Sequence, residues 1–483
     1  MTRQIQRMGV VVLVLFGALF ANLNVISLLQ ADELANHPAN RRVIIREYAI
    51  ERGPLVVGEV AVARSVETDG EYRFLRSYPE GELYAHLTGY YSILLQRFGL
   101  EEALNEDLTG RPTEVVAQNL GELLGGRDRP GNAVELTIDA RAQEAARDAL
   151  DGREGAVVAI EPSTGAVLAS YANPTFDPNP FSSHDLGAVA EAWDELLEDP
   201  QRPVVNRALA ETYPPGSAFK VVVAAAALES GMQPETEFPD ETVFDVPQTT
   251  ADIRNFGQGR CAGGDTIDLQ DALRVSCNTV FARLGVELGA DALVDQAERF
   301  GFNQAVPFEL GVAPSAIPDD LDVPATAQSA IGQRDVRATP LQMAMVAAAI
   351  ANDGEVMRPY LVANVRDPSG RRLRGPDISR WNGLPGGGEP VSPRTAAQLR
   401  DMMIDVVESG TGTAAQISGA TVGGKTGTAQ TGAQPTVWFI GFADERIAVA
   451  VVVPDAADDD TGGRVAAPIA QRVMAAVVGE DAP

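Results

Sequence analysis

Residues 213–228 read Tyr213-Pro214-Pro215-Gly216-Ser217-Ala218-Phe219-Lys220-Val221-Val222-Val223-Ala224-Ala225-Ala226-Ala227-Leu228. Two prolines and a glycine end any preceding regular structure, so the pattern predicts that Ser217 lies in the first turn of a helix. The run that follows is apolar on every side of that helix. Because a helix without a polar face is normally enclosed by other elements, we expect it to be the central buried helix of its domain.

Ser217 and Lys220 are three residues apart and would share one face of this helix. Long chains often contain such a pair by chance, and alone it carries little weight. The composition adds weight, because only two of the 38 Lys and Arg residues are lysines, Lys220 and Lys425. Arginine does not deprotonate in proteins, whereas a lysine that is buried or close to another cation can lose its proton. A lysine at position 220 therefore indicates a base.

Two other segments hold groups that could work with this pair. Lys425 lies in a glycine-rich segment, an expected strand, that reads Gly423-Gly424-Lys425-Thr426-Gly427-Thr428-Ala429. Between two helical patterns, Ser276 and Asn278 flank Cys277. Serine and asparagine are ordinary residues at helix ends, so the second segment is weak by itself. Its value comes from the order along the chain, which is Ser-x-x-Lys, then Ser-x-Asn, then Lys-Thr-Gly.

The sequence gives little support to a catalytic triad, a metal site, a phosphate-binding loop or nucleic-acid binding. The three histidines, His37, His86 and His184, all precede Ser217, which disfavours a Ser-His-Asp triad. No cysteine and histidine cluster has metal-ligand spacing, and the sequence contains no glycine-rich phosphate loop. The net charge of -29 argues against nucleic-acid binding, which needs a basic surface. We therefore expect no metal, no cofactor and no nucleic-acid partner.

The N-terminal residues have the pattern of a membrane anchor. Arg3 and Arg7 precede a mostly apolar run, and Asp32 follows it. About 20 apolar residues cross a bilayer, and the positive-inside bias places the N-terminus in the cytoplasm. We expect a cytoplasmic tail at residues 1–7 and a transmembrane helix at residues 8–29, with the rest of the chain outside the cell. The alternative is a cleaved signal peptide, although the run is long for one and no clear Ala-x-Ala site follows.

The remaining chain is expected to form two modules. Residues 30–127 would be a small β-rich, non-catalytic module, residues 128–133 a linker, and residues 134–483 the larger domain. In the first module, strand-like patterns occur at Arg41–Tyr48, Leu55–Ala63 and Tyr72–Tyr78, and helical pieces near Leu94 and Leu100.

The larger domain has the pattern of an α+β fold. A helical pattern at its start is followed by one hairpin, and a second hairpin and a last helix stand near the C-terminus. These elements are a helix at Leu136–Leu150, hairpins at Ala156–Ile160 with Ala166–Tyr171 and at Thr436–Phe442 with Ile447–Val453, and a helix at Val465–Val478. Strands at both ends with helices between them predict an antiparallel sheet assembled from distant parts of the chain.

Together the three motifs resemble those of the penicillin-binding, serine active-site transpeptidases. The matching segments are Ser217-Ala218-Phe219-Lys220, Ser276-Cys277-Asn278 and Lys425-Thr426-Gly427-Thr428, with Ile331-Gly332-Gln333 and Thr339-Pro340-Leu341-Gln342-Met343-Ala344 as context. The resemblance covers about residues 134 to 480. The N-terminal span, Arg52-Gly53 and the absence of a glycosyltransferase-like domain resemble the class B subgroup, in particular the penicillin-binding protein A type of actinobacteria. The resemblance implies a five-stranded antiparallel sheet flanked by helices, with an all-helical subdomain.

Physical chemistry and the resemblance together suggest a role for each residue. Ser217 at a helix N-terminus would be the nucleophile, neutral Lys220 would accept its proton, and the charge of Lys425 would lower the pKa of Lys220. The resemblance implies that Ser276 relays a proton to the leaving amine and that Asn278 orients the substrate. It also implies an oxyanion hole from the backbone N–H groups of Ser217 and Thr428, and a substrate carboxylate site at Thr426, Gly427 and Thr428.

The implied function is that of a membrane-bound peptidoglycan D,D-transpeptidase. It would form an acyl-enzyme with D-Ala-D-Ala stem peptides, pass the acyl group to a neighbouring amine, and bind β-lactams covalently. A lipid II polymerase of the SEDS glycosyltransferase type is the expected membrane partner. A D,D-carboxypeptidase or serine β-lactamase would share all three motifs. A β-lactam receptor and a purely structural component of the division or elongation machinery are further alternatives.

The two cysteines, Cys261 and Cys277, lie outside the cell on this topology, where a disulfide could persist. We predict that they form a disulfide that restrains the loop before Ser276. Two separate thiols are the alternative, because the sequence does not give the Cα distance that a disulfide requires.

Overall fold

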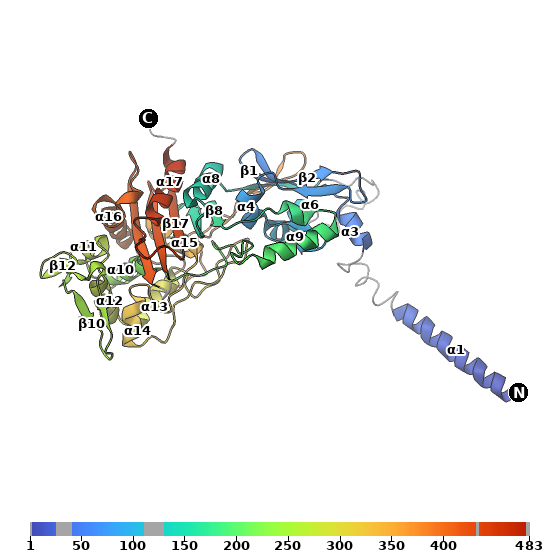
Figure 1. The fold of residues 1–483 in the computed structure, drawn as a ribbon, viewed down its shortest axis with the longest axis horizontal. Helices are drawn as coiled ribbons and strands as arrows, with labels where there is room; N and C mark the ends of the chain where they lie inside the picture. The colour runs from blue at the N-terminus through green and yellow to red at the C-terminus, as the bar shows by residue number, and fades with distance from the viewer. Residues whose placement is uncertain (1, 26–40, 111–129, 431–433, 480–483) are drawn as a thin grey trace.

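The structure of the protein is a computed structural model that describes residues 2–25, 41–110, 130–430 and 434–479. The first helix, α1 (Thr2–Asn24), extends away from the body of the protein in Figure 1.

The transmembrane helix expected at residues 8–29 is not supported. In the described part of the chain, no helix is long and apolar enough to cross a membrane. α1 begins with polar residues, and its mostly apolar run lies between Met8 and Asn22. Residues 26–29 of the expected span lie outside the described residues.

The larger domain contains an antiparallel sheet with the strand order β15-β16-β17-β7-β8. Its strands are β7 (Gly155–Ile160), β8 (Val167–Asn173), β15 (Val422–Gln430), β16 (Pro435–Ala443) and β17 (Ile447–Val453). Both predicted hairpins, β7–β8 and β16–β17, are confirmed, and the β17–β7 pairing joins them in the middle of the sheet. The paired residues of β17 and β7 are 288 to 296 positions apart in the chain, so the sheet is assembled from distant segments, as the α+β pattern predicts.

Helices cover both faces of this sheet. α8 (Ala140–Leu150) and α17 (Ala466–Val478) pack against each other on one face, and α15 (Pro340–Ala351) covers the other. Every residue of β17 is buried, as expected for a strand that is covered on both sides. The prediction of a central buried helix is also confirmed, because residues 220–228 of α10 (Lys220–Glu229) are buried.

A layer of helices surrounds α10. Its members α11 (Leu269–Arg274), α12 (Asn278–Leu288), α13 (Ala290–Arg299) and α16 (Pro393–Ser409) contact α10, and α14 (Val323–Ser329) packs against α12 and α13. α16 also contacts β15 of the sheet. The layer is not all-helical, which corrects the expectation. It includes two small sheets, which are β9 (Glu237–Pro239) with β12 (Thr266–Asp268) and β10 (Val243–Asp245) with β11 (Asp252–Arg254). Strands of this length are too short for their alternation to be recognised in the sequence.

A second sheet joins the two modules. The strand patterns predicted at Leu55–Ala63 and Tyr72–Tyr78 are confirmed as parts of it, whereas its continuation into the larger domain was not predicted. Its order is β14-β13-β6-β1-β2-β3, and the β1–β6 pairing is parallel. The strands are β1 (Leu55–Val57), β2 (Val60–Glu67), β3 (Phe74–Ser77), β6 (Ala133–Leu136), β13 (Val362–Arg366) and β14 (Arg372–Arg374). Gly53 permits the segments that precede β1 and β6 to approach each other closely, since a Cβ at Gly53 would lie 1.9 Å from the backbone oxygen of Asn132.

Two expectations for the first module were wrong. The segment predicted as a strand at Arg41–Tyr48 is a helix, α3 (Arg41–Glu47), because β-branched residues favour strands only where a neighbouring strand is available. The helical piece near Leu94 is a tight hairpin of β4 (Tyr91–Ser92) and β5 (Gln96–Arg97). The piece near Leu100 is helical, as α5 (Leu100–Ala103). Two further helices of the first module are α4 (Gly81–Thr88) and α6 (Asn105–Thr109), and α9 (Leu186–Glu198) comes from the larger domain's part of the sequence.

Four short 3₁₀ helices are present in the described part of the chain, which are η2 (Asn179–Ser182), η3 (Gly216–Phe219), η4 (Phe256–Gln258) and η5 (Thr413–Ala415). Of these, η3 holds the candidate nucleophile.

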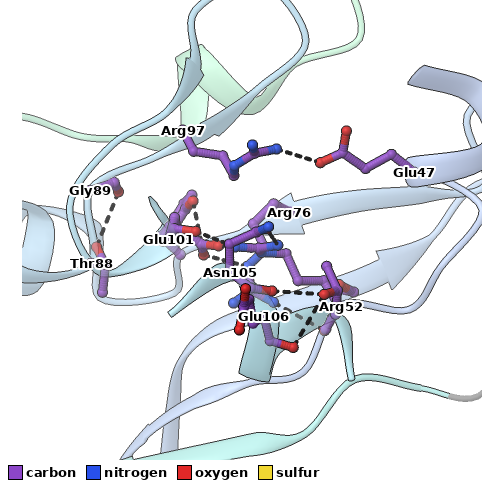
Figure 2. A network of polar contacts seen from close by, with 12 residues as sticks. Glu47, Arg52, Arg76, Thr88, Gly89, Arg97, Glu101, Asn105 and Glu106 are labelled. Atoms are coloured by element: carbon purple, nitrogen blue, oxygen red, sulfur yellow. Dashed lines mark hydrogen bonds and ion pairs between the residues drawn. The ribbon is translucent and has the colours of Figure 1, made fainter. Parts of the chain in front are cut away.

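A buried ion-pair network holds the first module together (Figure 2). Glu101 on α5 accepts from Arg52 Nε at 2.5 Å and from Arg76 Nε at 2.6 Å, and its side chain has no exposed area. Burial alone would raise the pKa of Glu101, but the charges of Arg76 and Arg52 outweigh it, and the pKa is lowered. Arg52 also donates to Asn105 Oδ1 at 2.7 Å. The network therefore joins the segment before β1 to β3, α5 and α6.

We expect Glu101→Gln to destabilise the protein by about 3–5 kcal/mol, because it removes the counter-charge that two buried guanidinium groups share. Glu67→Gln is the matched control, since Glu67 pairs with Arg73 in an exposed ion pair, and its effect should stay within about 0.5 kcal/mol. Denaturant unfolding of both variants measures the difference. Equal stability of the two variants would show that the buried pair contributes no more than the exposed one.

Candidate active site

Ser217 lies in η3, a 3₁₀ turn that runs directly into α10, as the predicted helix start requires. The turn is held from two sides. Gly216 N donates to Gly332 O at 2.9 Å, and Trp438 Nε1 on β16 donates to Pro214 O at 2.9 Å. Gly332 has a φ of +68°, and a Cβ there would lie 1.9 Å from Gly216 O. The Ile-Gly-Gln context segment therefore supports the backbone of the serine turn.

The structure brings the three motifs together around Ser276. Lys220 Nζ donates to Asn278 Oδ1 at 2.7 Å and to Ser276 O at 2.8 Å, and lies 3.4 Å from Ser276 Oγ. Lys425 Nζ donates to Ser276 Oγ at 2.9 Å and to Thr426 O at 3.0 Å. The Ser276 hydroxyl thus lies between the amines of the only two lysines in the sequence.

Both lysines are buried without any exposed area. Burial lowers the pKa of Lys425 to about 7. Burial and, after it, the charge of Lys425 lower the pKa of Lys220 well below its usual value. Among the described residues, no carboxylate forms an ion pair with either lysine. Lys220 therefore loses its proton first, and a neutral Lys220 beside a charged Lys425 is the form that this site favours.

Ser276 has a φ of +63°, a left-handed conformation that is unusual for a residue with a side chain. It joins α11 to α12, and Lys220 holds its carbonyl oxygen. Strain of this kind costs of order 1–3 kcal/mol and persists only where the surroundings impose it. The conformation places the Ser276 hydroxyl between the two amines.

The third motif lies on β15, at the edge of the sheet. A Cβ at Gly427 would lie 2.5 Å from Pro215 O, so only glycine lets the strand approach the serine turn this closely. The Thr426 hydroxyl is buried and hydrogen-bonds with the Thr411 hydroxyl at 2.7 Å. Thr428 Oγ1 accepts from Gly462 N at 3.3 Å and is the more accessible of the two hydroxyls.

Cys261 and Cys277 are bonded to each other, with Cα atoms 5.8 Å apart. With Asp240 they form a group of potential metal ligands in the described part of the chain. The sulfurs are engaged in the disulfide, and the buried Asp240 carboxylate accepts from the backbone N–H groups of Cys261, Ala262 and Gly263 at 2.7–2.9 Å. This group therefore braces the loop before Ser276.

Sequence reasoning missed three residues that support the site. Trp438 anchors the serine turn, Thr411 binds the hydroxyl of Thr426, and Asn255 binds the start of α12. Each acts on a motif from a distant part of the chain. A lone tryptophan, threonine or asparagine outside a motif gives no signal of such a contact in a single sequence.

A serine at a helix start, a neutral lysine one turn on and a second, charged lysine define a serine acyl-transfer enzyme with a lysine base. Residues 155–475 match the penicillin binding protein transpeptidase domain family, and residues 52–134 match the penicillin binding protein A dimerisation domain family. The chain belongs to the penicillin-binding protein transpeptidase family, which confirms the resemblance seen in the motifs.

Known relatives match almost the whole chain. The peptidoglycan D,D-transpeptidase PbpA of Mycolicibacterium smegmatis is 42% identical over 99% of this chain and 100% of its own length. PbpA of Mycobacterium tuberculosis is 39% identical with the same coverage. A ceftriaxone acyl-enzyme complex of penicillin-binding protein A from M. tuberculosis matches with a TM-score of 0.85 and 38% identity, over 90% of this chain and 100% of that one. Its penicillin G acyl-enzyme complex matches with a TM-score of 0.83 and 39% identity, over 88% and 99%.

The rate of acylation by penicillin should depend on the protonation of Lys220. A protonated Lys220 cannot act as a base, so this rate should fall at low pH. In Lys425→Met the neighbouring charge is gone, the pKa of Lys220 rises, and the acid limb of the acylation rate should move to higher pH. Lys425→Arg keeps the charge and should keep the position of that limb, even where its absolute rate is lower. An acid limb at the same pH in all three proteins would show that Lys425 does not act on the pKa of Lys220.

Proposed function

We propose that this chain is a peptidoglycan D,D-transpeptidase with Ser217 as its nucleophile and Lys220 as its base. The observation that carries the proposal is that both buried lysines lie at the Ser276 hydroxyl, and that one of them, Lys220, follows Ser217 by one helical turn. The full-length relatives named D,D-transpeptidase and the β-lactam acyl-enzymes of a related structure support it.

In the first step, neutral Lys220 takes the proton of Ser217 Oγ as that oxygen attacks the carbonyl carbon of the penultimate D-Ala. The backbone N–H groups of Ser217 and Thr428 would stabilise the developing oxyanion, and each donor contributes about 3 kcal/mol in comparable sites. Collapse of the tetrahedral intermediate breaks the peptide bond. The leaving D-Ala amine receives the proton from Lys220 through the Ser276 hydroxyl.

In the second step, the amine of a neighbouring stem peptide attacks the acyl-enzyme carbonyl. Its proton passes back through the same groups to Ser217 Oγ, so a new amide forms and the serine is regenerated. Asn278 would orient the donor peptide, and Thr426, Gly427 and Thr428 would bind its terminal carboxylate. Because β15 is an edge strand, its outer side can pair with an extended peptide.

A D,D-carboxypeptidase or serine β-lactamase would perform the same first step and then transfer the acyl group to water. The relatives that match the full length of the chain favour the transpeptidase. Incubation with a labelled D-Ala-D-Ala donor and a stem-peptide amine acceptor separates the two. A cross-linked product that penicillin suppresses supports the proposal, whereas release of trimmed peptide or opened penicillin alone contradicts it.

We also propose that the catalytic domain works outside the cytoplasm, attached to the membrane at residues 8–29, beside a lipid II polymerase of the SEDS type. The charges that flank the apolar run support the orientation. Membrane fractionation with protease added from outside tests this. A protein that remains in the soluble fraction, or whose mature N-terminus lies after residue 21, would contradict the anchor. Detergent co-purification without such a polymerase would contradict the partner.

Penicillin should acylate Ser217 and no other residue, as mapped by mass spectrometry. Lys220→Arg should slow acylation by about 10² or more, because arginine keeps the charge but cannot accept the proton. Lys425→Arg should be milder, because Lys425 is proposed to stay charged. Kinetics with a fluorescent penicillin decide the matter. A label on Ser276, or labelling of Lys220→Arg at the wild-type rate, would refute the assignment of nucleophile and base.

A further inference from the structure

Asn255 lies between β11 and η4, and only 6% of its surface is exposed. Its side-chain oxygen accepts from the backbone N–H groups of Asn278 and Thr279, both at 3.0 Å. Its side-chain nitrogen donates to Glu241 O at 2.9 Å and to Gly259 O at 3.0 Å. Two donors and two accepted bonds use the whole hydrogen-bonding capacity of a carboxamide.

These contacts replace a helix cap that α12 lacks. The residue at the N-cap position of α12 is Cys277, whose side chain forms no capping hydrogen bond and is tied to Cys261. The first N–H groups of a helix need acceptors. Asn255 supplies the acceptor from a segment more than twenty residues earlier in the chain.

The same segment also fixes the side chain of Asn278. Asn278 Nδ2 donates at 3.0 Å to the backbone oxygen of Arg254, which is the residue before Asn255. Because the nitrogen end of the carboxamide is held there, its oxygen points to Lys220, from which it accepts at 2.7 Å. The backbone and the side chain of Asn278 are thus both held by residues 254 and 255.

We propose that Asn255 is a positioning residue for acylation, which holds the start of α12 so that Asn278 Oδ1 faces Lys220 and Ser276 keeps its left-handed conformation. It acts through Asn278, whose backbone N–H it binds. The inference rests on the proposed function, because it concerns the groups that activate Ser217.

The test compares three substitutions in the full chain with a fluorescent penicillin, each at the pH of its maximal acylation rate, together with the melting temperature. Asn255→Ala removes both accepted bonds and should slow acylation by about 10- to 100-fold, as expected for a misplaced catalytic group. Asn255→Asp keeps the acceptor but loses both donors, and it should retain most of the rate even if its melting temperature falls.

Gln143→Ala is the matched control for general destabilisation. Gln143 is a fully buried carboxamide that donates to Leu83 O at 2.9 Å and to Ser170 O at 3.0 Å, on α8 and away from the three motifs. Its loss should lower the melting temperature and leave the acylation rate unchanged. A drop in rate in Gln143→Ala as large as in Asn255→Ala would mean that Asn255 acts only through stability, which overturns the proposal.

Ser217→Ala separates this inference from the proposed function. If Ser217→Ala does not label and Asn255→Ala labels at the wild-type rate, the positioning role is refuted and the proposed function stands. If Ser217→Ala still labels, the proposed function itself fails. Should Asn255→Ala not fold, Asn255→Asp decides: a rate close to that of the wild type supports the acceptor role, and a loss of about tenfold or more overturns it.

Discussion

The site depends on the burial of two ammonium groups beside one serine hydroxyl, and no carboxylate in the described part of the chain forms an ion pair with either. Removing a charge from water without a counter-charge is costly, and the group responds by giving up its proton. Burial lowers the pKa of both groups that share the Ser276 hydroxyl, and the charge of Lys425 lowers the pKa of Lys220 further. The result is a lysine base that is neutral under conditions in which a free lysine would be fully protonated.

Much of the surrounding fold serves to enclose this pair. Lys220 is buried because α10, the helix that carries it, is apolar on every side and is enclosed by its neighbours. β15 carries Lys425 close to the serine turn because Gly427 has no side chain to collide with Pro215. Ser276 completes the arrangement in a strained conformation between α11 and α12. The three elements are far apart in the sequence, so the site exists only once the sheet and both helical layers have assembled.

The sequence predicted the features that depend on local patterns. The rarity of lysine singled out Lys220, and the hairpins and the buried helix followed from alternation and apolar runs. The features that the sequence did not predict depend on long-range contacts or on very short elements. The second sheet pairs strands of the first module with β6, β13 and β14 from distant parts of the chain, and this pairing was not predicted. The segment at Arg41–Tyr48 has no partner strand and forms a helix. Asn255 reaches α12 through the tertiary fold alone. Single-sequence patterns contain no record of such contacts.

The protonation of the two lysines can be measured directly, because the chain contains only these two. Labelling with lysine that carries ¹³C at the ε-carbon gives two side-chain NMR signals, and Lys425→Arg identifies which one belongs to Lys220. A pH titration of the full-length protein should show the Lys425 signal titrating near 7 and the Lys220 signal titrating well below the pKa of free lysine. Two signals that both titrate near the pKa of free lysine, about 10.4, would contradict the account, because Lys220 could not then accept the proton of Ser217.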